Sequence, residues 1–310
     1  MTPRPSRPRD HANSGGQTPS SSRRRLLAGV AAAGALAVAP RLAFAGAGAP
    51  GGNRLVLVIL RGGMDGLGAV PAIGDPDFAS ARGPLAQFGL PALPIDATFA
   101  LHPNLVELHA MVGRREATIV HAVSLAYHER SHFDAQQVLE SGATRPYELQ
   151  TGWLGRALAA SGEKGIALET SVPLVLRGRA AVDTWAPSVL PDPSADLVAR
   201  LERLYAGDPA LATALERARM LHLDAPSPTG AEPMASGAMA AGAAPRPGAF
   251  VVLARRAAEF LAQAAGPQAA VLEIGGWDTH ANQANPNGPL ANALRQLDAG
   301  LAALRNDLDG

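Results

Sequence analysis

Residues 53–66 read Asn-Arg-Leu-Val-Leu-Val-Ile-Leu-Arg-Gly-Gly-Met-Asp-Gly, an apolar run followed by a glycine-rich turn. An uninterrupted run of Val, Ile and Leu predicts a strand that is buried on both faces, because a half-exposed strand would alternate apolar and polar residues. Strands buried on both faces are typical of parallel sheets covered by helices. The run Leu55–Leu60 therefore indicates an α/β fold.

Further strands and helices follow along the chain. The apolar runs Thr118–Val123 and Ala269–Ile274 predict two more buried strands, and Ala167–Leu176 predicts an edge-like strand interrupted by Pro173. Helical spacing of apolar residues, or a cap and a stop signal, predicts the helices Ser131–Ser141, Ala195–Tyr205, Pro209–Leu223, Phe250–Ala265 and Leu290–Leu308. The alternation predicts a mostly parallel sheet with helices on both faces and a ligand site at the carboxyl ends of the strands.

The first 45 residues have the pattern of a targeting segment. A basic stretch, Ser22–Leu27 (Ser-Arg-Arg-Arg-Leu-Leu), leads into the apolar run Leu26–Ala39 and then the small-residue site Ala43–Ala45. The apolar run is too short for a membrane span, which needs about 20 residues. We expect a twin-arginine signal peptide over residues 1–45, with an ordinary secretion signal as the alternative. The twin-arginine export machinery would then deliver residues 46–310 to the periplasm or the exterior.

Composition excludes several kinds of function. The 310 residues include no Cys, which excludes disulfides, Cys-ligated metals and a thiol nucleophile. The 27 basic and 27 acidic residues are unevenly distributed, because residues 1–45 hold seven Arg and one acid. Residues 46–310 are therefore net acidic, which argues against nucleic-acid binding. No run in them is long and apolar enough to span a membrane, and residues 225–248 predict a flexible, low-complexity loop.

One candidate for chemistry is Asp65, which follows the first predicted strand in a glycine-rich turn. Glycines allow the backbone to approach a ligand closely, and a carboxylate there can bind a hard cation. The alternative is a structural role, in which Asp65 caps a turn or helix.

A second candidate is Ser131, at the predicted start of a helix. With Asp134 three residues later it forms a pair typical of a capping box. The same position suits a nucleophile, because a helix N-terminus stabilises anionic groups. Several polar side chains accompany it in the sequence: His128, Arg130 and His132.

A third candidate is the pair Asp278 and His280, directly after the predicted strand Ala269–Ile274. Two residues apart in an extended chain, the two side chains point to the same side and can ligate one metal ion. The alternative is a polar turn with Trp277 packed beneath it. His102 and His121, each alone near a predicted strand end or turn, are interpreted as hydrogen-bonded core residues.

Taken in order, the motifs resemble the family named domain of unknown function 1501, whose bacterial exported members are related to the alkaline phosphatase and sulfatase superfamily. The resemblance covers about residues 53–308. Its motifs are Leu-Arg-Gly-Gly-Met-Asp-Gly-Leu (60–67), Arg-Ser-His-Phe-Asp-Ala-Gln (130–136), Gly-Trp-Leu-x-Arg (152–156), Pro-Leu-Val-Leu-Arg-Gly (173–178) and Gly-Gly-Trp-Asp-Thr-His-Ala-Asn-Gln (275–283).

The resemblance implies an alkaline-phosphatase-like fold and metal-dependent hydrolysis of small anionic phosphate or sulfate esters. It implies Ser131 as nucleophile, with Arg130 binding a substrate oxygen and His132 beside them. It also implies divalent ions (Zn, Mn, Ca or Mg) held by Asp65, Glu273, Asp278 and His280. Two such ions can clamp the attacking and leaving oxygens.

The chain also departs from the family pattern. Family members continue past the last helix, with a strand carrying Ser/Thr-Glu-Phe-Gly-Arg-Thr and a loop carrying Thr-Asp-His-Gly, whereas this sequence stops at Gly310. We therefore expect a C-terminally truncated or split member that lacks a strand and part of the metal shell. Three functions stay open: an exported hydrolase or its N-terminal part, a non-catalytic binding or assembly protein with an exported partner, and an inactive fragment.

Overall fold

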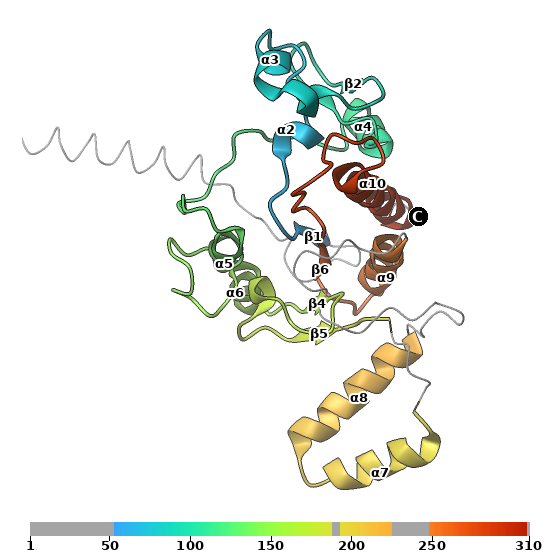
Figure 1. Cartoon of the computed structure of the whole chain (residues 1–310). Helices are drawn as coiled ribbons and strands as arrows, with labels where there is room; N and C mark the ends of the chain where they lie inside the picture. Colours follow the sequence, from blue (N-terminus) through green and yellow to red (C-terminus); the bar gives the residue numbers. More distant parts are fainter. Residues whose placement is uncertain (1–52, 188–192, 225–247, 309–310) are drawn as a thin grey trace, which may run out of the picture. The chain divides into compact units, whose positions relative to one another are not determined.

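The computed structural model describes residues 53–187, 193–224 and 248–308 (Figure 1). All of them belong to one unit of the chain, residues 46–310. The predicted signal peptide lies outside the described residues, as does the predicted loop 225–248 apart from Gly248.

The centre of the fold is a four-stranded parallel sheet with the order β1-β6-β4-β5. Its strands are β1 (Leu55–Leu60), β4 (Gly165–Ala167), β5 (Val182–Thr184) and β6 (Ala269–Ile274). Leu55 lies opposite Ala269 and Leu60 opposite Ile274, so β1 and β6 end at the same edge. The predicted α/β fold with a mostly parallel sheet is confirmed, and β1 and β6 have the predicted bounds.

The other elements connect and cover this sheet. Two short antiparallel strands pair with each other, β2 (Leu93–Pro94) and β3 (Ala100–Leu101). The helices are α2 (Gly66–Ala69), α3 (Phe78–Arg82), α4 (Val106–Gly113), α5 (His132–Ser141), α6 (Trp153–Ser161), α7 (Ala195–Tyr205), α8 (Pro209–Asp224), α9 (Ala249–Ala262) and α10 (Pro289–Leu308). Two 3-10 turns complete the set, η1 (Gly83–Ala86) and η2 (Leu174–Leu176). The predicted helices α5, α7, α8, α9 and α10 all form, within a few residues of the predicted ends.

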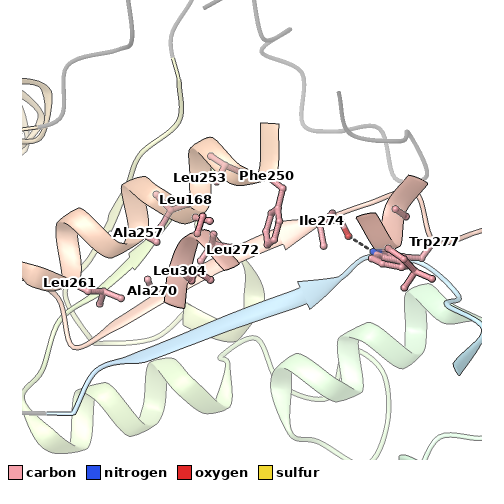
Figure 2. Close-up of a cluster of buried hydrophobic side chains, with 14 of the residues drawn as sticks. Leu168, Phe250, Leu253, Ala257, Leu261, Ala270, Leu272, Ile274, Trp277 and Leu304 are labelled. Carbon is pink, nitrogen blue, oxygen red and sulfur yellow. Dashed lines mark hydrogen bonds between the residues drawn. The ribbon is translucent and has the colours of Figure 1, made fainter. Parts of the chain in front are cut away.

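The main core lies where α9 and α10 cover one face of the sheet, while α5 and α6 lie on the other side (Figure 1). Figure 2 shows Leu253, Ala257 and Leu261 of α9 close to Ala270 and Leu272 of β6. The two helices come together because Gly300 of α10 has no side chain where the ring of Phe250 lies. None of the described helices combines the length and apolar character needed to cross a bilayer.

Two of the recognised motifs hold α5, α6 and η2 together. Gly155 lets α6 approach the backbone of residues 176–177, since a Cβ there would lie 2.5 Å from the carbonyl oxygen of Arg177. Arg156 donates to the carbonyl oxygen of Ser141 at 2.8 Å, which satisfies a free carbonyl at the end of α5. These residues therefore have structural roles.

Two predicted strands are wrong. Thr118–Val123 has no regular structure, and Val120 and Val123 are each 73% exposed. An apolar run becomes a strand only where a neighbouring strand satisfies its backbone groups, and no described strand pairs with this one. In the predicted strand Ala167–Leu176 only the first residue belongs to β4, and the chain forms η2 directly after Pro173, which has no N–H to donate.

Candidate active site

A cleft of about 570 Å³ opens at the carboxyl ends of β1, β4 and β6, along one side of α5. Parallel strands end at one edge of their sheet, so the loops that follow them meet there. The predicted location of the ligand site is thus occupied by a cleft. Its charged and titratable lining residues are Arg61, His132, Glu140, Tyr147, Glu169, Arg177, Glu273 and Asp278.

Arg61, which follows β1, is the centre of an ion-pair network in this cleft. Its guanidinium forms ion pairs with Glu273 of β6 and Glu140 of α5. Burial disfavours the charged guanidinium, but hydrogen bonds and charges from the two carboxylates outweigh this and raise the pKa of Arg61. Glu140 is itself buried and also accepts a hydrogen bond from the Val175 amide at 3.1 Å. The network links the sheet, α5 and η2.

Asp278 lies against the turn that follows β1. Its Oδ1 accepts a hydrogen bond from the Gly63 amide at 2.6 Å. A Cβ at Gly62, whose φ is +125°, would lie 3.1 Å from Asp278 Oδ2. The glycines of this turn are therefore required for the close approach of a carboxylate that is 216 positions later in the sequence than Gly62.

His132, the first residue of α5, faces the same carboxylate. Its Nε2 lies 3.2 Å from Asp278 Oδ2. This nitrogen is shielded from solvent and makes no hydrogen bond of good geometry among the described residues. The two groups therefore lie in direct contact, which becomes an ion pair when the imidazole is protonated.

The backbone of residues 277–280 is not extended, although the predicted pairing of Asp278 with His280 required an extended chain. The His280 amide donates to the Asp278 carbonyl at 3.2 Å, and the Thr279 amide donates to the Trp277 carbonyl at 3.1 Å. These three-residue turns break the alternation on which the prediction rested. His280 is exposed and does not line the cleft. Trp277 is buried, as the alternative interpretation predicted, and donates to the Ile274 carbonyl at 2.8 Å (Figure 2).

Asp65 lies outside the lining of this cleft. It occupies the N-cap position of α2 but makes no side-chain cap hydrogen bond. Instead its Oδ2 forms an ion pair with Arg82 and accepts from Gln283 Nε2 at 2.5 Å. Gln283 is the last residue of the motif that contains Asp278, so the first and last recognised motifs meet at Asp65.

Ser131 is the N-cap of α5. Its Oγ accepts from the Asp134 amide at 3.3 Å, which is half of the predicted capping box. The Asp134 carboxylate does not complete the box, because it accepts a hydrogen bond from the Tyr127 hydroxyl at 3.2 Å. Neither Ser131 nor the exposed Arg130 is among the residues that line the cleft.

Three of the predicted metal ligands have other partners. Glu273 pairs with Arg61, Asp65 pairs with Arg82, and Asp278 accepts from Gly63. In residues 53–187, 193–224 and 248–308 no group of three or more His, Asp or Glu side chains is arranged to hold a metal ion. As folded here, the described donor set does not fit a closed metal site.

Glu169 is a cleft residue that the motifs do not indicate. It lies two residues after β4, at the same edge of the sheet as Glu273. Burial and the negative charge of Glu273 raise the pKa of Glu169 to about 7. The available signal in the sequence was a carboxylate two residues after the strand Gly165–Ala167. The sequence analysis missed this signal because the apolar pattern predicted that the strand continues to Leu176.

The two isolated histidines differ in environment. His102 is buried, and its Nδ1 accepts from the Asn104 amide at 3.1 Å. Burial, together with the charge of Arg295, lowers its pKa to about 4. His121 is partly exposed and stacks on Phe99 with ring centroids 3.9 Å apart. His102 is thus the predicted core residue, whereas His121 is a packed surface residue.

The fold and the cleft define an α/β protein with a cleft at the carboxyl edge of a parallel sheet. The chain belongs to the family described as protein of unknown function (DUF1501), whose model matches residues 121–310. No curated protein and no solved structure gives a significant match.

Proposed function

We propose that the protein is an exported hydrolase of phosphate or sulfate esters that acts in the cleft at the carboxyl ends of β1, β4 and β6. The observation that carries the proposal is the contact between His132 Nε2 and Asp278 Oδ2, 3.2 Å apart within this cleft. A histidine beside a carboxylate is a common general acid–base pair, because the carboxylate orients the imidazole and stabilises its protonated form.

In this reaction water replaces the alcohol on phosphorus or sulfur. The P–O or S–O bond to the alcohol breaks, and the alcohol leaves with a proton. His132 takes up and returns the proton at Nδ1, the ring nitrogen that does not face Asp278, and Asp278 holds the charge that forms on the imidazole. The first turn of α5 favours an anionic group nearby, since its amide groups carry partial positive charge.

A divalent cation (Zn, Mn, Ca or Mg) stays part of the proposal. With Arg61 already paired to Glu140 and Glu273, the cleft has Glu169 and Asp278 as further carboxylates and Arg177 as a further cation. Such a lining attracts an anionic ester poorly unless a cation is added. We propose that Asp278 supplies one ligand to this cation.

Export and nucleophile are also proposals. Residues 1–45 are proposed to direct the folded chain through the twin-arginine machinery to the periplasm or exterior, where an exported partner protein is proposed to associate with it. Replacing Arg23 and Arg24 by Lys is expected to retain the chain inside the cell.

Ser131 acts as nucleophile only if its Oγ leaves the Asp134 amide and turns toward the cleft.

Hydrolysis of p-nitrophenyl phosphate and p-nitrophenyl sulfate by the full chain tests the proposal, with each of the four metals and without metal. His132→Gln and Asp278→Asn are each expected to lower kcat/KM at least about 100-fold. His109→Gln is the matched control, because His109 lies on α4 and does not line the cleft. Absence of turnover in a folded wild-type chain under all these conditions would overturn the proposal.

The second candidate is a non-catalytic binding or assembly protein on the same scaffold. It is favoured by one observation, that Ser131 serves as a helix cap outside the cleft lining. A folded chain that hydrolyses neither ester, but binds them with an affinity that His132→Gln reduces, would establish this function instead.

A further inference from the structure

The cleft also has an apolar side that the proposed reaction does not use. Its lining includes Phe133, Tyr147, Val172, Pro173 and Leu174. Phe133 is 52% exposed and Tyr147 is 69% exposed. Large aromatic side chains that share a cleft and stay exposed are typical of ligand-binding sites, since core packing would bury them.

Tyr147 has a constrained backbone. Its φ is +60°, a left-handed conformation that costs a residue with a side chain about 1–2 kcal/mol. The surrounding turn holds this conformation, because Glu148 Oε2 accepts from the amides of Thr144 and Arg145 at 3.2 and 3.1 Å. The backbone that places the ring is therefore fixed by local hydrogen bonds.

The other end of the Tyr147 side chain is near a carboxylate. Its hydroxyl interacts with Asp134 in the first turn of α5, and this interaction raises the pKa of Tyr147. The same carboxylate accepts the Tyr127 hydroxyl. An exposed ring on a backbone that is held by local hydrogen bonds loses less conformational freedom when a ligand packs on it, which favours binding.

Phe133 connects this apolar side to the proposed reacting groups. Its ring lies against the imidazole of His132, with centroids 4.1 Å apart. His132 in turn contacts Asp278. A ligand group that packs on Phe133 therefore lies next to the proposed acid–base pair. In an ester bound in this way, the ester group lies at His132 and Asp278, and the alcohol half bonded to it lies on Phe133.

We propose that the cleft takes esters whose alcohol half is aromatic, with that ring packed on Phe133 and Tyr147 and the ester group at His132 and Asp278. This inference rests on the proposed hydrolase function and names its substrate class. The volume of about 570 Å³ agrees with it, because pockets of about 300–1,000 Å³ hold ligands far larger than a phosphate or sulfate group alone.

The test compares benzyl phosphate with ethyl phosphate as substrates of the full chain. Both are esters of primary alcohols, so the ratio of their kcat/KM values reports recognition of the ring. The wild-type chain is expected to prefer the benzyl ester at least about tenfold. Phe133→Ala and Tyr147→Gly are each expected to lower that ratio about threefold to tenfold.

Tyr147→Gly is chosen because glycine adopts a positive φ without strain, so the variant removes the ring without disturbing the turn. Leu204→Ala is the matched control, because Leu204 is an exposed apolar residue on α7 that does not line the cleft. The control is expected to keep the wild-type ratio. Equal turnover of both esters, or a ratio that Phe133→Ala and Tyr147→Gly leave unchanged, would overturn the inference while the hydrolase function stands.

Calorimetric titration with benzylphosphonate separates the two proposals further, because this compound cannot be hydrolysed at an ester oxygen. Binding that weakens at least about threefold in Tyr147→Gly supports the aromatic site even in a chain that hydrolyses nothing. Hydrolysis of ethyl phosphate without any binding of benzylphosphonate supports the hydrolase alone and contradicts the aromatic site.

Discussion

Arg61 forms an ion pair with Glu273 on the neighbouring strand, so the arginine that follows β1 neutralises a carboxylate of its own cleft. The same guanidinium pairs with Glu140 on α5. A buried network of this kind leaves uncompensated charge when its centre is removed. The structure of the cleft therefore depends on the Arg61 side chain.

Arg61→Leu is expected to destabilise the chain by about 2–4 kcal/mol, because Glu140 and Glu273 would then lie partly buried without their cation. Denaturant unfolding of the full chain measures this. Arg114→Leu is the control, since Arg114 forms an exposed ion pair with Glu116 and should cost less than about 1 kcal/mol. Equal losses in the two variants would contradict a structural role for the Arg61 network.

Gly62→Ala is expected to displace the Asp278 carboxylate. The added Cβ would lie 3.1 Å from Asp278 Oδ2, and the φ of +125° is unfavourable for alanine. We expect a loss of about 1–3 kcal/mol in unfolding free energy together with a loss of the His132-dependent activity. Gly113→Ala, where a Cβ meets nothing within 4 Å, should be close to neutral; a large effect there would point to a general sensitivity to alanine.

Glu169 makes stability depend on pH. Its pKa in the folded chain, about 7, is raised above the usual value of 4.5 by burial and by Glu273. The protonated form therefore favours folding, and this contribution is lost as pH rises from about 4.5 through 7. Glu169→Gln should remove that loss, so the variant gains stability relative to wild type over this range, on the order of 1–3 kcal/mol.

Glu148 is expected to affect the pH dependence of the unfolding free energy in the opposite direction, which Glu148→Gln tests. Hydrogen bonds from the backbone of Arg145 and from Thr144 lower the pKa of Glu148. Its contribution is present above its ordinary pKa and is lost as pH falls through the lowered value. Unfolding free energies of wild type and both variants between about pH 2 and pH 8 check the two signs, and parallel curves for wild type and Glu169→Gln would refute the assignment of Glu169.

Two substitutions separate the roles of Ser131. Ser131→Ala should cost about 1 kcal/mol, because the Asp134 amide at the start of α5 loses its acceptor. Ser131→Asp should keep the cap and hence the stability. If Ser131 is also the nucleophile, both variants lose ester hydrolysis; activity in Ser131→Asp equal to wild type would restrict the residue to capping.

Elemental analysis of the natively exported chain tests the divalent cation. The proposal expects at least about one equivalent of Zn, Mn, Ca or Mg per folded chain, with Asp278 as one ligand. Asp278→Ala should lower the metal content, whereas Asp183→Ala, in which the ion pair to Arg217 is removed away from the cleft, should not. A folded wild-type chain with no bound metal would contradict the metal requirement.

Much of the fold follows from local sequence pattern. The apolar runs Leu55–Leu60 and Ala269–Ile274 are strands with the predicted bounds, and Ser131 begins α5 as a cap. These features depend on residues that are close together in the sequence, so a local sequence pattern is enough to predict them. The run Thr118–Val123 is also rich in apolar residues but has no partner strand among the described residues, so its apolar pattern alone did not decide its structure.

The side-chain partners of the site depend on tertiary structure. The sequence predicted carboxylates and glycines at the strand ends, but it could not indicate that Arg61 would pair with Glu140 and Glu273, or Asp65 with Arg82. It also could not bring His132 to Asp278, which is 146 positions away. Strand order and register decide these contacts, because they set which loop ends meet at the edge of the sheet. The sequence thus determined β1, β6, the helices α5, α7, α8, α9 and α10, and the family, while packing between distant segments decided the arrangement of the cleft.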